Sequence, residues 1–156
     1  MKYGLLSIFF LFCVSVFAGE LDYSVKNRFD QKGVKYTITK NNDFRVIVKT
    51  EGGRDQLVLI FSSTENYKGM KIREISSVGF IGNLTPSISR EMLKRTNSLK
   101  MGGWSMFVGN NGKDYGTFSI KFIDQNVSAA DFAELVDFVG SVADKLEKDF
   151  LQKDDL

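Results

Sequence analysis

A long amphipathic segment near the C-terminal end constrains the fold more than any other feature of this sequence. Its apolar residues recur every three or four positions and form one stripe: Phe132, Leu135, Val136, Val139, Val142, Ala143, Leu146 and Phe150. Ser128, with Asp131 three residues later, predicts the N-terminal cap of a helix. A helix of that length extends about 30 Å. We expect it to lie along a β-sheet, because a sheet offers an apolar surface that covers the stripe.

The sheet is predicted from segments in which apolar and polar residues alternate, or in which a short apolar run is continuous. Asn, Asp and Gly residues separate several of these segments, so neighbouring strands are expected to form hairpins. The predicted strands cover residues 34–39, 44–50, 57–61, 70–81, 104–108 and 115–123. The alternation changes phase at Ile75, which predicts a bulge or a bend there. Asn110, Asn111 and Gly112 predict a type I′ turn between the last two strands.

Two further helices are expected before the long one. Residues 19–32 show weak helical periodicity that ends at Gly33. Thr85 and Pro86 predict the start of a second helix, as N-cap and first helical residue, and Gly102 predicts its end. Hairpins without crossovers imply an antiparallel sheet. The predicted fold class is therefore α+β, with an antiparallel sheet, helices packed on one of its faces and a long C-terminal helix.

Residues 1–18 have the pattern of a secretory signal peptide. Lys2 supplies the basic start, an apolar run follows, and the small residues Val16 and Ala18 precede a cleavage site. The apolar run is shorter than the roughly 20 residues of a membrane-spanning helix. We therefore expect cleavage after Ala18, a single mature domain of residues 19–156 without a transmembrane segment, and a periplasmic or secreted location.

The composition excludes most catalytic and metal-binding chemistry. The chain has no histidine, and its single cysteine, Cys13, lies inside the predicted signal. The mature protein therefore lacks the usual zinc, copper and iron ligands, and it lacks nucleophile–base pairs that use histidine or cysteine. The formal charge of +2 moves closer to zero when Lys2 leaves with the signal, so no nucleic-acid partner is expected. We predict a protein that is not an enzyme, with no catalytic residue, no cofactor and no metal.

Residues 86–150 resemble the YbjN-like family, the bacterial sensory transduction regulator family. The shared pattern is a helix with an Asn near its end, here Asn97, then a hairpin of residues 104–108 and 115–123, then a long final helix. With the preceding strand, the resemblance covers about residues 70–150. It implies a fold like that of the small dimeric chaperones of type III secretion, and hence a protein-binding module without catalytic residues or cofactor. A homodimer is one oligomeric state that the resemblance implies.

Four residues are predicted to bind a partner: Phe138, Arg90, Lys94 and Asn97. Phe138 lies at the edge of the apolar stripe, where it either anchors an interface or packs beneath a strand edge. Arg90 and Lys94 form either an anion or membrane-surface patch or an ordinary solvated helix face. Asn97 either meets a partner or hydrogen-bonds the backbone near the end of its helix.

The predicted function is that of an extracytoplasmic, non-enzymatic protein-interaction domain of YbjN-like type, chaperone-like or regulatory, with a protein partner. The alternative function is an envelope-located binder of an apolar small molecule or lipid. For that alternative, the Phe-rich space between the sheet and the helices is the expected site.

Overall fold

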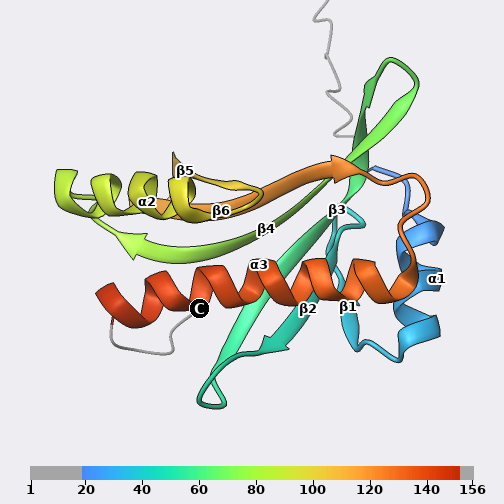
Figure 1. Ribbon diagram of the computed structural model, residues 1–156, viewed down its shortest axis with the longest axis horizontal. Coiled ribbons are helices and arrows are strands. Elements are labelled where there is room, and N and C mark those ends of the chain that lie inside the picture. Colours follow the sequence, from blue (N-terminus) through green and yellow to red (C-terminus); the bar gives the residue numbers. More distant parts are fainter. Residues whose placement is uncertain (1–18, 152–156) are drawn as a thin grey trace, which may run out of the picture.

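The computed structural model describes residues 19–151, so the predicted signal peptide and residues 152–156 lie outside the described residues. Within residues 19–151 the chain forms a six-stranded antiparallel sheet and three helices (Figure 1). The helices are α1 (Tyr23–Lys32), α2 (Pro86–Ser98) and α3 (Ala129–Phe150). The strands are β1 (Tyr36–Ile38), β2 (Phe44–Lys49), β3 (Asp55–Tyr67), β4 (Met70–Gly82), β5 (Gly103–Val108) and β6 (Asp114–Ile123).

Local sequence signals set the ends of the helices. The Asp22 carboxylate caps α1, and Gly33 ends it with a φ of 67° that favours glycine. Thr85 caps α2, with Pro86 as the first helical residue. The Ser128 hydroxyl caps α3. The predicted helix starts at Thr85 and Ser128 are confirmed.

The strands lie in the order β1-β2-β3-β4-β6-β5, and every neighbouring pair is antiparallel. β3 and β4 are the longest strands, with 13 residues each, and they occupy the middle of the sheet. The turn between them projects beyond the other strands (Figure 1). The short β1 and the six-residue β5 form the two edges.

β4 lies beside two register irregularities, one next to Ile75 in the ladder with β3 and one at Gly79 in the ladder with β6. The irregularity predicted at Ile75 is therefore confirmed, although the extra residues lie on β3. Ile75 pairs with Ile60 and Arg73 pairs with Thr64, so residues 61–63 of β3 lie opposite Glu74 alone, whereas the register with β6 shifts next to Gly79. A Cβ atom at Gly79 would lie 2.7 Å from the Trp104 ring, so glycine allows this close approach. The polar Arg73 lies on the buried face of β4 and is fully buried, which interrupts the apolar alternation before Ile75.

The turn between β5 and β6 also differs from its prediction. Gly109 donates to the Lys113 carbonyl at 2.8 Å, and Gly112 donates to the Gly109 carbonyl at 2.9 Å. A type I′ turn needs positive φ at both central residues. In this turn only Gly112 has a positive φ, of 72°. The connection is therefore a type I turn followed by a left-handed glycine.

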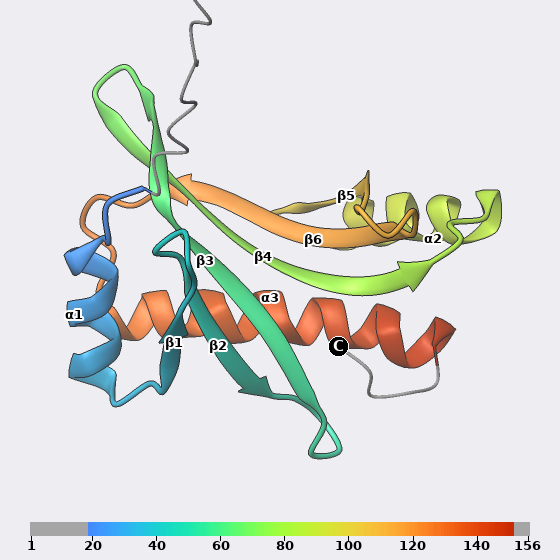
Figure 2. The same ribbon diagram turned by 180° about the vertical axis from the view of Figure 1, so that it is seen from behind.

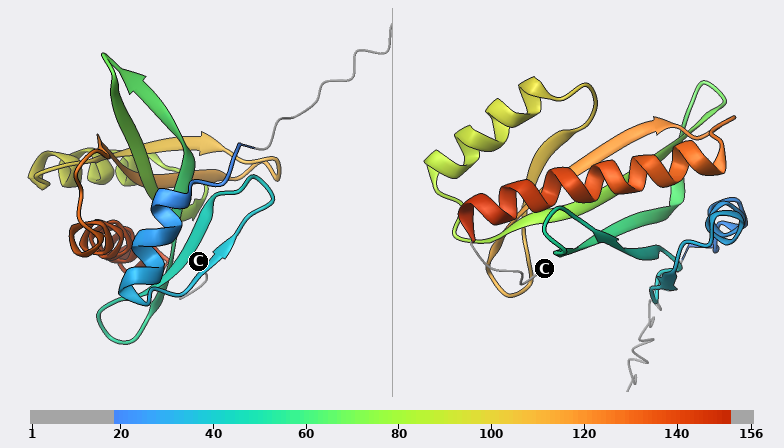
Figure 3. Two further views of the ribbon diagram at one scale, coloured as in Figure 1. Left: turned by 90° about the vertical axis from the view of Figure 1, so that its right-hand side faces the viewer. Right: turned by 60° about the horizontal axis from the view of Figure 1, so that its bottom comes forward.

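All three described helices pack on one face of the sheet. α3 runs across β2, β3 and β4, as Figures 1 and 3 show. α1 packs against α3 and crosses it steeply, and α2 lies beside β5 (Figure 3). From behind, β3 and β4 cross in front of α3, and no helix of residues 19–151 covers them (Figure 2). The predicted α+β fold class, with helices on one face and a long C-terminal helix, is confirmed.

The core lies between the helices and the sheet. Stripe residues of α3 that are at most 2% exposed are Phe132, Val136, Val139, Ala143 and Leu146. Phe29 of α1 packs edge-to-face on Phe44 of β2 and on Phe132, with ring centroids 5.8 and 5.5 Å apart. Because these rings contact one another, the Phe-rich space between sheet and helices is packed core.

Candidate interaction surfaces

A buried ion-pair network, here called the Arg73 network, joins α1 to the sheet. The Arg73 guanidinium donates to Asp124 at 2.7 Å and to Asp22 at 2.5 Å, and Arg28 of α1 donates to the second Asp124 oxygen at 2.5 Å. Burial raises the pKa of Asp22. Hydrogen bonds from Ser24 and Arg73, together with the Arg73 charge, lower this pKa by more than burial raises it, so the net shift is downward. Every charge in the network has an opposite partner, so its role is to anchor α1.

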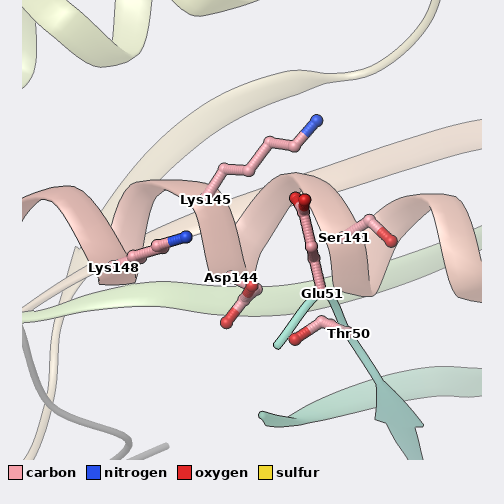
Figure 4. Close-up of a pocket in the computed structure, with 6 residues that line it drawn as sticks. All are labelled: Thr50, Glu51, Ser141, Asp144, Lys145 and Lys148. Carbon is pink, nitrogen blue, oxygen red and sulfur yellow. The ribbon is translucent and has the colours of Figure 1, made fainter. Parts of the chain in front are cut away.

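A small groove lies between α3 and the turn that joins β2 and β3. Figure 4 shows its lining residues: Thr50, Glu51, Ser141, Asp144, Lys145 and Lys148. Its volume is about 180 Å³, below the roughly 300–1,000 Å³ of small-molecule sites. Asp144 accepts a hydrogen bond from Arg54 at 2.6 Å, and Arg54 also reaches Glu147 at 3.3 Å. The acids beside this groove serve a structural ion pair, and we assign no ligand to it.

The face of the sheet opposite α3, here called the helix-free face, carries a larger groove. This sheet groove has a volume of about 400 Å³ and reaches from β2 and β3 to β5 and β6. Its apolar lining residues are Leu57, Leu59, Phe61, Val78, Ile81, Phe107 and Tyr115. Phe107 and Tyr115 stack in parallel with centroids 5.0 Å apart. The groove is therefore a concave apolar surface on a face that is usually polar in a half-solvated sheet.

Two polar residues stand out in the lining of the sheet groove. Arg45 of β2 is exposed and lies directly opposite Leu59 of β3 in the strand register. Thr117 of β6 is 8% exposed, and its hydroxyl oxygen has no hydrogen-bond partner among the described residues. Arg45 is the charged residue of this lining, so it fixes the electrostatic character of the groove.

β5 forms an edge of the sheet with an unusually apolar sequence. Its six residues, GWSMFV, include no charge and no proline. Met106, Phe107 and Val108 are 53, 51 and 63% exposed. Natural sheets usually protect an edge strand with a charge, a proline, a bulge or a covering element. The second half of β5 has none of these devices among its own residues.

The hydrogen bonding of the β5–β6 hairpin shows which backbone groups of β5 face outward. Hydrogen-bonded and non-hydrogen-bonded pairs alternate along an antiparallel ladder. Because Gly109 bonds Lys113, the backbone groups of Phe107 face β6, and those of Met106 and Val108 face the free edge. At the other end of β5, the outward N–H of Trp104 is already bonded to Thr96 of α2 at 3.1 Å. The open part of the edge is therefore at Met106 and Val108.

The structure groups three of the four predicted partner-binding residues and separates the fourth. Arg90, Lys94 and Asn97 are exposed on one face of α2. Phe138 is half-buried and packs edge-to-face on Phe118, 5.9 Å away, so it takes the packed alternative. None of the four lines the sheet groove. Their roles in partner binding stay predictions.

Sequence reasoning did not single out Arg45, Met106 or Val108. For Met106 and Val108, the available signal was an uncharged strand beside a hairpin turn. The position of Arg45 in the groove depends on the strand register, which the sequence does not give. Within residues 19–151, no three possible metal ligands gather, and none of the helices has the length and apolarity that crossing a membrane requires. No protein-family model and no curated protein matches this chain.

Proposed function

We propose that this chain is a non-enzymatic protein-interaction domain that acts in the periplasm or outside the cell and pairs through the free edge of β5. The observation that supports this proposal is the open edge at Met106 and Val108. An added strand satisfies outward N–H and C=O groups and covers the apolar side chains beside them. The resemblance to the YbjN-like family also implies a protein-binding module.

The partner that we assign to this edge is a second copy of β5. Around a two-fold axis at Phe107, the outward groups of Met106 in one copy meet those of Val108 in the other. The two Phe107 rings then form a cross-strand aromatic pair. β5 carries no charge, so two copies meet without like-charge repulsion. The Thr96–Trp104 hydrogen bond limits the pairing to the second half of the strand.

Exposed apolar residues beside the edge enlarge the surface that pairing buries. Met106 and Val108 project to the helix side, where Leu93 of α2 is 67% exposed and lines a hollow together with Met106. Phe107 projects to the helix-free face, where it stacks on Tyr115. The surface around β5 therefore supplies apolar contacts on both sides of the added strand.

Analytical ultracentrifugation of the mature chain tests this proposal. We expect a concentration-dependent monomer–dimer equilibrium that Met106→Pro and Met106→Lys shift toward the monomer by at least about tenfold, which corresponds to about 1.4 kcal/mol. Proline removes an outward N–H that the monomer does not use, and lysine places two like charges on either side of the axis at Phe107. Ile47→Lys is the matched control, because Ile47 is 55% exposed on β2 and Met106 is 53% exposed.

Two results would overturn the proposal. One is a monomer at every concentration, with no protein cross-linked to position 108 in intact cells. The other is a dimer that Met106→Pro leaves unchanged while circular dichroism shows that the variant is folded. A cross-link from position 108 to a different protein would retain the edge as the interaction surface and replace the second copy as its partner.

A further inference from the structure

The sheet groove has the dimensions and lining of a ligand site. The proposed β5 pairing does not involve the residues that β2 and β3 contribute to this groove. Its volume of about 400 Å³ lies in the lower part of the roughly 300–1,000 Å³ range of small-molecule pockets. Apolar side chains from β3, β4, β5 and β6 surround it. A groove of this volume accommodates one acyl chain more readily than the two chains of a phospholipid.

The charge in the lining indicates which end group the ligand carries. Arg45 stands at the β2 side of the groove, next to Leu59, and makes no ion pair with another described residue. The other charged side chains of the helix-free face have partners of opposite charge, since Lys49 pairs with Asp55 and Lys121 lies between Glu65 and Glu74, a group that keeps one net negative charge. Arg45 is therefore the cation of this face without an ion-pair partner among the described residues. A guanidinium presents a planar pair of donors that matches a carboxylate.

We propose that the sheet groove binds a free fatty acid, with the acyl chain along the apolar lining and the carboxylate at Arg45. Leu57 and Leu59 of β3 contact one side of the chain, and the stacked Phe107 and Tyr115 close the other end of the groove. Transfer of the acyl chain from water to this surface drives binding, and Arg45 sets its direction and selects the acid.

Isothermal titration calorimetry of the mature protein with octanoate, decanoate and dodecanoate, each below its micelle-forming concentration, tests the site. We expect affinity to rise about two- to fourfold per added methylene, because a fully buried methylene contributes about 0.8 kcal/mol and an open groove buries part of each. Arg45→Gln should weaken decanoate binding about fivefold, near the upper limit for a partly exposed ion pair, and leave binding of 1-decanol unchanged. Arg90→Gln, at an exposed arginine on α2, is the matched control.

A second variant keeps the test independent of Arg45. Phe107→Ala removes a half-exposed ring from the groove wall and should weaken decanoate and 1-decanol equally. The proposal is overturned if decanoate does not bind at millimolar concentration, if affinity is independent of chain length, or if Arg45→Gln affects acid and alcohol alike. Failure of β5 to pair would leave all three readouts intact, because every lining residue of the groove belongs to one copy of the chain.

Discussion

Replacing Arg73 with methionine tests how strongly the Arg73 network holds α1 on the sheet. Arg73 is fully buried and donates to Asp124, to Asp22 and to the Phe61 carbonyl, the last at 2.6 Å. Methionine keeps much of the side-chain volume and adapts to irregular spaces. The substitution therefore removes the buried charge and its hydrogen bonds while disturbing the packing little.

The expected loss of stability depends on the interactions that Asp22 and Asp124 retain after Arg73 is replaced. Removing one partner of a buried ion pair costs about 3–5 kcal/mol, because the other charge is left without compensation. Asp124 retains its bond to Arg28, and the Asp22 side chain is 18% exposed to water. Both facts place the expected loss near the lower limit, at about 3 kcal/mol.

Urea unfolding of the mature chain at pH 7, followed by circular dichroism, measures this loss. Lys121→Met is the control, because the ion pair of Lys121 with Glu65 has side-chain exposures of 48 and 70%. Exposed pairs of this kind contribute about 0–1 kcal/mol. If Arg73→Met costs no more than Lys121→Met, the network does not anchor α1 and the reasoning is refuted.

Two further predictions concern the packing and the charge of α3. Gly79→Ala should lower the free energy of unfolding by about 1–3 kcal/mol in urea titrations. The added Cβ would lie 2.7 Å from both the Ala143 carbonyl and the Trp104 ring. Unchanged stability would show that α3 shifts away from the sheet without cost, which would contradict close packing at this position. Partial removal from water, and then the charge of Glu134, raise the pKa of Asp137 above its ordinary value of 3.8. The charged form is therefore disfavoured in the folded state, and stability falls as the pH rises through the range in which Asp137 loses its proton. Asp137→Asn should therefore raise the melting temperature at pH 7 and leave it unchanged below about pH 3. A calorimetric melting temperature that falls at pH 7 in the variant would contradict the conclusion that the charged form of Asp137 destabilises the fold.

The starts of α2 and α3 and most strands were predictable because local chemistry decides them, whereas α2 ends at Ser98 and not at the predicted Gly102. Thr85 with Pro86, and Ser128 with Asp131, cap helices by short-range hydrogen bonds that depend only on neighbouring residues. The apolar stripe of α3 likewise reflects a period that any helix on a sheet must follow. These signals do not depend on contacts with residues distant in the sequence.

The buried charges and the interaction surfaces were not predictable, because they depend on residues distant in sequence. Asp144 occupies a polar helix position, yet it is 3% exposed because Arg54, 90 residues away, pairs with it. Arg73 lies on the buried face of β4 because Asp22 and Asp124, each 51 residues away, pair with it, and its charge interrupts the apolar alternation before Ile75. The open edge of β5 follows from the sheet order, which alternation alone does not determine.

Amide hydrogen exchange at Met106 and Val108, followed by NMR at low and high protein concentration, tests the central claim most directly. The account predicts that these two amides exchange freely in the dilute monomer and become protected as the dimer forms. The Phe107 amide, which faces β6, should be protected at both concentrations and serves as the internal control. Free exchange of Met106 and Val108 in a sample that sedimentation shows to be dimeric would contradict pairing through β5.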